Sequence, residues 1–295
     1  MNLTDRRRQL EILWQTVFHD SDEYVRMFFD RVYQPENTFV IEQEGRGVVA
    51  MLQAVPYGVK INSAILPCAY VCGVCTHPSE RGKGYMKVLL REAMHAMRKR
   101  GFALSMLIPA EPWLFEVYRR YGYTVPINVG VEYYVADRME QTDTCRIIPC
   151  PEKTYDAYFD LTQRRRRCAV LHDAADFETI RLDCLADGGH VWVALDGERP
   201  VGMAFEAPES STDVLIKEIL YDDPAVKDAL IRYILIRHHA QTAFVRVPYL
   251  TGRNAQPYGL ACPLDETVEP SDLQRVFMSR SEEHTSELQS PSWIS

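Results

Sequence analysis

Apolar residues recur at two different spacings along the chain. Near the start, Leu10, Leu13 and Trp14 repeat every three or four residues, which is typical of a helix with one buried face. Further on, continuous apolar runs around a Gly-containing turn indicate strands. The elements expected in the first half are, in chain order, helices over residues 4–18 and 21–33, strands over 38–43, 48–55 and 64–76, a helix over 81–100, a strand over 103–108, a helix over 112–121 and a strand over 128–135. The central strand–helix–strand unit implies a right-handed parallel crossover.

The second half is expected to repeat this order in a shorter form. Its expected elements are a helix over residues 155–166, strands over 191–195, 201–207 and 214–220, a helix over 225–238 and a strand over 243–247. The order resembles that of the first half, although the two halves share no repeat in sequence. A stretch with prolines and cysteines at residues 144–151 is typical of a linker.

The composition is that of an ordinary globular protein. Of the 295 residues, 46% are hydrophobic and 25% are charged, which excludes a wholly disordered or collagen-like chain. No run approaches eighteen apolar residues and the chain does not start with a signal peptide, so we expect a cytoplasmic protein that does not enter a membrane. The eight cysteines are then expected to be reduced thiols. The formal net charge of −8 disfavours nucleic acid as a partner.

The most informative segment joins an expected strand to an expected helix through a loop that contains two glycines. Gly82 and Gly84 let backbone amides approach a ligand closely, and the start of a helix offers unpaired N–H groups. Arg81 and Lys83 add positive charge. Together these features predict a diphosphate-binding site, and a helix start without a ligand is the alternative. The glycine spacing matches neither a GxxxxGK[ST] nor a GxGxxG loop.

Two motifs in this region resemble those of one enzyme family. The run from Arg81 to Met86 resembles the acetyl-CoA loop of GNAT acetyltransferases, R/Q-x-x-G-x-G/A, with Met86 in place of the final small residue. Residues 111–123, which include Tyr118, resemble the tyrosine motif of the same family, in particular of its enhanced-intracellular-survival (Eis-like) branch. The resemblance covers residues 1–136 well and residues 150–270 loosely.

The resemblance implies an α/β (α+β) fold of the GNAT acyl-CoA acyltransferase type, with a mixed central sheet flanked by helices. We expect a GNAT acetyltransferase domain over residues 1–140, a linker over 141–153 and a second, degenerate GNAT-like domain over 154–279. The second domain is expected to bind no CoA, because residues 221–225 have two carboxylates and a proline where a phosphate loop would lie. Residues 280–295 resemble a translated sequencing adapter and are expected to be a non-native tail.

The activity implied by the resemblance is that of an N-acetyltransferase, which transfers acetyl from acetyl-CoA directly to an amine of a small molecule or peptide. Tyr118 is the candidate general acid, because a neutral phenol can donate a proton to the departing thiolate. The residues expected to bind acetyl-CoA are Val74, Cys75, Thr76, Arg81, Gly82, Lys83, Gly84, Tyr85, Met86, Ala110 and Glu111. No general base is evident, and the alternative is a GNAT-fold module that binds CoA or senses it without turnover.

No metal cofactor is expected. Cys72 and Cys75 form a CxxC pair, but no second pair follows at zinc-site spacing, so buried thiols are the favoured interpretation and a redox or zinc protein the lesser one. Neither His190 nor the pair His238-His239 has a companion carboxylate at metal-ligand spacing in the sequence. The sequence does not determine which amine is the acceptor or whether the chain forms a homo-oligomer.

Overall fold

A computed structural model describes residues 3–140, 145–248, 255–274 and 276. The elements of the first half are α1 (Leu3–Phe18), α2 (Asp22–Arg31), β1 (Thr38–Gln43), β2 (Gly47–Ile61), β3 (Ala64–Thr76), α3 (Tyr85–Lys99), β4 (Leu104–Leu107), α4 (Leu114–Arg119) and β5 (Val125–Val135). Those of the second half are β6 (Arg146–Pro149), α5 (Asp156–Arg165), β7 (Cys168–Leu171), α6 (Ala174–Ala186), β8 (His190–Asp196), β9 (Arg199–Pro208), β10 (Asp213–Tyr221), α7 (Pro224–Arg237), β11 (Thr242–Pro248), β12 (Ala255–Pro263) and α8 (Pro270–Leu273).

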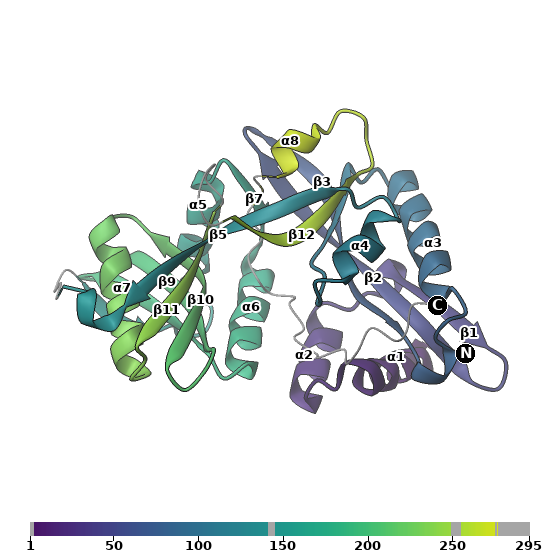
Figure 1. Cartoon of the computed structure of the whole chain (residues 1–295), viewed down its shortest axis with the longest axis horizontal. Helices are drawn as coiled ribbons and strands as arrows, with labels where there is room; N and C mark the ends of the chain where they lie inside the picture. The colour runs from purple at the N-terminus through teal and green to yellow at the C-terminus, as the bar shows by residue number, and fades with distance from the viewer. Residues whose placement is uncertain (1–2, 141–144, 249–254, 275, 277–295) are drawn as a thin grey trace.

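One mixed sheet runs through both halves (Figure 1). Its strand order is β1-β2-β3-β4-β12-β5-β11-β10-β9-β8-β6, and β7 pairs with β2 outside this path. The pairs β3–β4 and β10–β11 are parallel, and each is joined by one long helix, α3 or α7. The predicted mixed sheet flanked by helices, with a helical crossover in each half, is therefore confirmed.

Strand β5 connects the two halves. It runs from one half into the other in Figure 1, pairing with β11 along one edge and with β12 along the opposite edge. The sheet is therefore continuous between the halves.

Strand β12 was not predicted, and it lies far from its sequence neighbours. It follows the second-half elements in the chain but inserts between β4 and β5 of the first half. Leu260 and Ala261 are fully buried on opposite faces of the sheet, in the two apolar clusters of the first half. After β12, Leu273 and Val276 are also buried in the apolar cluster that contains Ala261, where α8 packs against β5. Part of the region proposed as the second domain thus completes the first sheet.

Helix α6 was also missed by the sequence analysis. Its start has a capping box, in which Asp173 accepts hydrogen bonds from the backbone of Ala175 and Asp176, and Asp176 accepts one from the backbone of Asp173. The helix buries charged residues among its apolar ones; Arg181 donates two hydrogen bonds of 2.9 Å to Glu178. These buried charges obscure the apolar repeat that would have predicted the helix.

Each half has helices on both faces of the sheet. In β2, alternate residues face opposite sides: Met51 and Val55 pack with α1 and α2, whereas Leu52 and Ala54 pack with α3 and α4. In the second half, α7 covers one face and α5 and α6 cover the other. None of the described helices is both long and apolar enough to span a membrane. The adapter-like tail at residues 280–295 and residues 141–144 of the expected linker lie outside the described residues.

Candidate active site

Strands β3 and β4 diverge in the middle of the first half. Their parallel pairing joins only Cys68–Tyr70 to Leu104–Met106, whereas β3 continues to Thr76. Ligands of open α/β sheets bind beyond the carboxyl ends of such strands. Val74, Cys75 and Thr76, which were predicted to contact the cofactor, lie in the part of β3 that follows its last pair with β4.

A β-bulge lies in the part of β3 that no longer pairs with β4. Cys72 pairs with Gln53 and Cys75 with Met51, so Gly73 and Val74 together face the single residue Leu52 of β2. Gly73 has a φ of +58°, which a side chain would strain. Bulged residues leave backbone groups outside the ladder, so a backbone N–H here could polarise a thioester carbonyl.

The glycine-containing loop is built as an open helix start. Gly82 and Gly84 have φ values of +79° and +77°, and α3 begins at Tyr85 rather than at Arg81 as predicted. The helix has no side-chain cap, and a Cβ placed on Gly84 would meet nothing within 4 Å. The N–H groups at the start of α3 therefore have no side-chain cap and the space beside Gly84 is open, an arrangement that can bind phosphate.

Glu80 fixes this loop from beneath. Its carboxylate is 3% exposed, forms an ion pair with Arg46, and accepts hydrogen bonds of 2.7 Å from Lys83 and 2.8 Å from Gln43. The bond from the Lys83 ammonium holds the pKa of Glu80 below its usual range. Sequence reasoning missed Glu80, because a single glutamate in a loop has no pattern to distinguish it.

The two predicted loop cations are held by the protein itself. Lys83 binds Glu80, and the Nε atom of Arg81 donates to the Thr76 carbonyl at 3.4 Å. Their charge lies beside the helix start, but both side chains also shape the loop. Tyr85 and Met86 are the first two residues of α3. Tyr85 accepts a hydrogen bond from Gln43, and Met86 is partly buried against the core.

Tyr118 combines burial with an unpaired hydroxyl. It is 7% exposed, and burial, followed by the neighbouring Cys72 and Cys75, raises its pKa well above the ordinary value. Its hydroxyl forms no hydrogen bond with any described residue. Its ring meets that of Tyr123 edge-on at 6.0 Å, and the Tyr123 hydroxyl is hydrogen-bonded to Ser105 at 2.8 Å. Of these two buried tyrosines, Tyr118 is thus the one whose proton remains available.

The remaining predicted site residues precede α4. Ala110 is exposed and Glu111 is partly buried, and the helix begins at Leu114, two residues later than expected. The carboxylate of Glu111 makes no ion pair within the described part of the chain. Cys72 and Cys75 are buried thiols, as the favoured interpretation predicted, and burial raises the pKa of Cys75.

The corresponding helix start in the second half is closed. Asp223 caps α7 by accepting a hydrogen bond of 2.8 Å from the Ala225 amide, and Pro224 has no N–H to offer. Asp222 is ion-paired with Arg165 at 3.0 Å and Arg199 at 3.4 Å. The carboxylates that were expected to repel phosphate are therefore also structural partners of the protein.

Comparisons with known proteins agree with this architecture. A family model described as an acetyltransferase (GNAT) domain matches residues 4–125. A GCN5-related N-acetyltransferase from Anabaena variabilis superposes with a TM-score of 0.70 at 16% identity, over 88% of this chain and 71% of that one. Eis1 from Mycobacterium abscessus superposes with a TM-score of 0.67 at 12% identity, over 90% and 73%.

A third solved structure extends the likeness to a lipid-transferring enzyme. Saccharomyces cerevisiae N-myristoyltransferase with bound myristoyl-CoA gives a TM-score of 0.57 at 12% identity, over 95% of this chain and 82% of that one. No curated protein matches the chain by sequence. The fold is that of the GNAT acyltransferases, and the part of the chain that matches the GNAT domain model is residues 4–125.

Proposed function

We propose that this protein transfers an acetyl group from acetyl-CoA directly to an amine, with Tyr118 as general acid. The observation that carries the proposal is the uncapped start of α3 at Gly84, which faces open space. Tyr118, with its unpaired hydroxyl, packs in the same apolar cluster that Val74, Tyr85 and Met86 border. A diphosphate group and a thioester could therefore be bound by one continuous region of the first domain.

The proposed cofactor contacts follow the chain. The diphosphate of CoA lies against the N–H groups of residues 82–86, with Arg81 and Lys83 beside it. The pantetheine runs along the free part of β3 at Val74, Cys75 and Thr76, and the acetyl group lies near Ala110 and Glu111. The GNAT fold in general binds acyl-CoA, and acetyl as the acyl group is part of this proposal.

The proposed reaction begins with attack by a neutral amine. An amine with a pKa near 10 is about one part in a thousand neutral at pH 7, a cost of about 4 kcal/mol, so its proton must leave to a base or to water. The nitrogen then bonds to the thioester carbon, and a bulge N–H at Val74 stabilises the oxyanion.

Collapse of this intermediate breaks the carbon–sulfur bond. The CoA thiolate takes the proton of Tyr118, and the phenolate recovers a proton from solvent. Burial raises the pKa of this phenol, and the same apolar surroundings raise that of the departing thiol, so the transfer stays feasible. No residue is assigned as the base.

Acetyl-CoA turnover against a panel of small-molecule and peptide amines, followed by detection of the free CoA thiol, tests the proposal. Amine-dependent thiol release supports it. A second candidate is a CoA-binding or sensory module without turnover, which the missing base favours. CoA binding by calorimetry without thiol release would establish that candidate, and absence of CoA binding would overturn both. Longer acyl-CoA substrates in the same assay test the choice of acetyl.

The two-domain division remains part of the proposal. The second half, with its capped helix α7, is proposed to bind no CoA and to shape the acceptor site or an oligomer contact. Calorimetry that finds a single CoA per chain supports this assignment, and two equivalent CoA sites would contradict it.

A further inference from the structure

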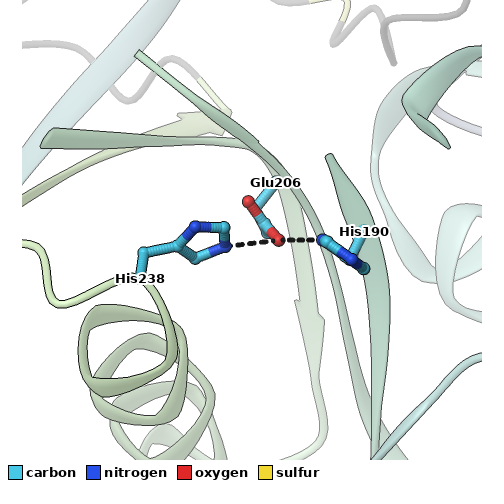
Figure 2. A group of neighbouring side chains, drawn as sticks. All are labelled: His190, Glu206 and His238. Carbon is cyan, nitrogen blue, oxygen red and sulfur yellow. Dashed lines mark hydrogen bonds and ion pairs between the residues drawn. The ribbon is translucent and has the colours of Figure 1, made fainter. Parts of the chain in front are cut away.

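Three polar side chains from separate elements meet in the second half (Figure 2). His190 begins β8, Glu206 lies on β9, and His238 directly follows α7 as its C-cap. The Oε1 atom of Glu206 lies 3.2 Å from Nδ1 of His190 and 2.9 Å from Nε2 of His238. The sequence shows no companion carboxylate at metal-ligand spacing, because the one that meets these histidines comes from β9, a strand that sheet pairing brings beside His190.

The carboxylate of Glu206 is buried, and its two oxygens differ in their hydrogen bonding. Glu206 is 0% exposed. In addition to its contacts with the two imidazoles, Oε1 accepts a hydrogen bond of 3.2 Å from Nε1 of Trp192. The other oxygen, Oε2, is buried without a hydrogen-bond partner in the described structure. A buried carboxylate of this kind needs a compensating positive charge close by.

We propose that His190, Glu206 and His238 bind a divalent transition-metal cation of the zinc class. Two imidazoles and one carboxylate form a ligand set that zinc takes in proteins, with a fourth position left for water. Bonds of about 2.0–2.1 Å in a tetrahedron place neighbouring ligand atoms about 3.3 Å apart. The separations of Glu206 Oε1 from the two imidazole nitrogens, 3.2 and 2.9 Å, are close to that value, and all three ligand atoms lie within 4.8 Å of one another.

The surroundings also suit a bound ion. The side chain of His190 is 41% exposed and that of His238 is 20% exposed, so an ion can enter from solvent and a water molecule can complete its coordination. The indole N–H of Trp192 would hold the carboxylate in orientation from outside the ligand shell. The ion would join β8, β9 and the end of α7, and it would stabilise the second half, because it binds only where these elements are assembled. The site is independent of the proposed acyl transfer.

Zinc titration of the full chain by calorimetry, together with thermal unfolding, tests the proposal. His190→Asn and His238→Asn each remove one imidazole but keep a polar group near Glu206. His239→Asn is the matched control, because His239 is exposed, directly follows His238, and has a φ of +51° that asparagine tolerates. We expect the wild type and the control to bind one zinc ion and to gain thermal stability from it. Each of the other two variants should bind at least about 100-fold more weakly.

The eight cysteines require a separate control. Cobalt substituted at the proposed site should give visible d–d absorption without a thiolate-to-cobalt charge-transfer band. Circular dichroism without metal verifies that each variant folds, and Glu206→Gln, which keeps the side-chain volume, replaces any variant that does not. Equal zinc affinity in all proteins, a thiolate band, or no zinc binding by the wild type would overturn the proposal. The three side chains would then be joined by hydrogen bonds alone.

Discussion

Trp14 packs so closely on Gly73 that a Cβ atom at position 73 would lie 2.5 Å from Cζ3 of the indole ring. Gly73 also has a φ of +58° and belongs to the bulge at which β3 turns away from β4. Helix α1, which carries Trp14, therefore supports the backbone segment to which we assign the oxyanion contact.

Gly73→Ala is expected to destabilise the protein by about 3 kcal/mol, because the methyl group adds a clash to a strained backbone. Urea denaturation measures this loss. Trp14→Phe removes the far ring of the indole, so the double variant should lose less stability than the sum of the two single variants. Strict additivity would show that the indole does not restrict position 73.

Gly84→Ala is expected to weaken CoA binding at least 10-fold, because its methyl group would occupy the open space assigned to the diphosphate. Gly101→Ala is the matched control. Gly101 lies just beyond the other end of α3 and has a φ of +78°. A Cβ atom at this position would also meet nothing within 4 Å. Both variants should lose about 1 kcal/mol of stability from backbone strain. Calorimetry should find reduced affinity only for Gly84→Ala; the same affinity in both variants would move the diphosphate elsewhere.

Tyr118→Phe is expected to lower kcat about 100-fold while leaving CoA affinity unchanged, because only proton donation to sulfur is lost. Steady-state kinetics and calorimetry separate the two quantities. Tyr123→Phe is the control: it removes a buried hydroxyl bonded to Ser105, which keeps its second bond, to the Ala69 carbonyl at 2.9 Å. That variant should lose about 1 kcal/mol of stability and little activity. Full turnover by Tyr118→Phe would exclude the tyrosine as general acid.

His172 makes the folded protein sensitive to acid. Its ring lies 5.2 Å from that of Tyr57, both ring nitrogens are buried without hydrogen-bond partners, and burial lowers its pKa to about 4. Its pKa in the unfolded chain is about 6.5, so the unfolded state binds more protons between these values. Stability from this residue is therefore lost as the pH falls from about 6.5 to about 4, by about 3 kcal/mol in all.

Comparison with His172→Phe isolates this effect. The phenyl ring keeps the contacts with Tyr57 and does not titrate, so denaturation should show the wild type losing stability relative to the variant as the pH falls. Asp176, whose Oδ2 atom lies 3.9 Å from the imidazole, has a pKa raised to about 6 by burial and titrates in the opposite sense. Asp176 is present in both proteins, so its contribution largely cancels in the difference between their free energies of unfolding. A difference that does not change between pH 7 and pH 4 would contradict the assignment.

Features set by short stretches of chain could be predicted from the sequence. The apolar repeats of α1, α2 and α3, the glycine pair at Gly82 and Gly84, and the placement of Tyr118 on a short helix all follow from residues a few positions apart. Where local rules misplaced an element, a local cause is visible: the positive φ at both loop glycines delays α3 to Tyr85.

Contacts between distant segments were decided by the tertiary structure alone. Strand β12 completes the first sheet, Glu80 gathers Gln43, Arg46 and Lys83 beneath the loop, and Glu206 meets two histidines from β8 and the end of α7. Periodicity and turn chemistry act over a few residues, whereas the order of strands in a sheet follows from burying both of its faces at once. The sequence by itself therefore determined the glycine loop and the phenol of the candidate site. Only the folded sheet determined which side chains meet at the buried carboxylates of Glu80 and Glu206.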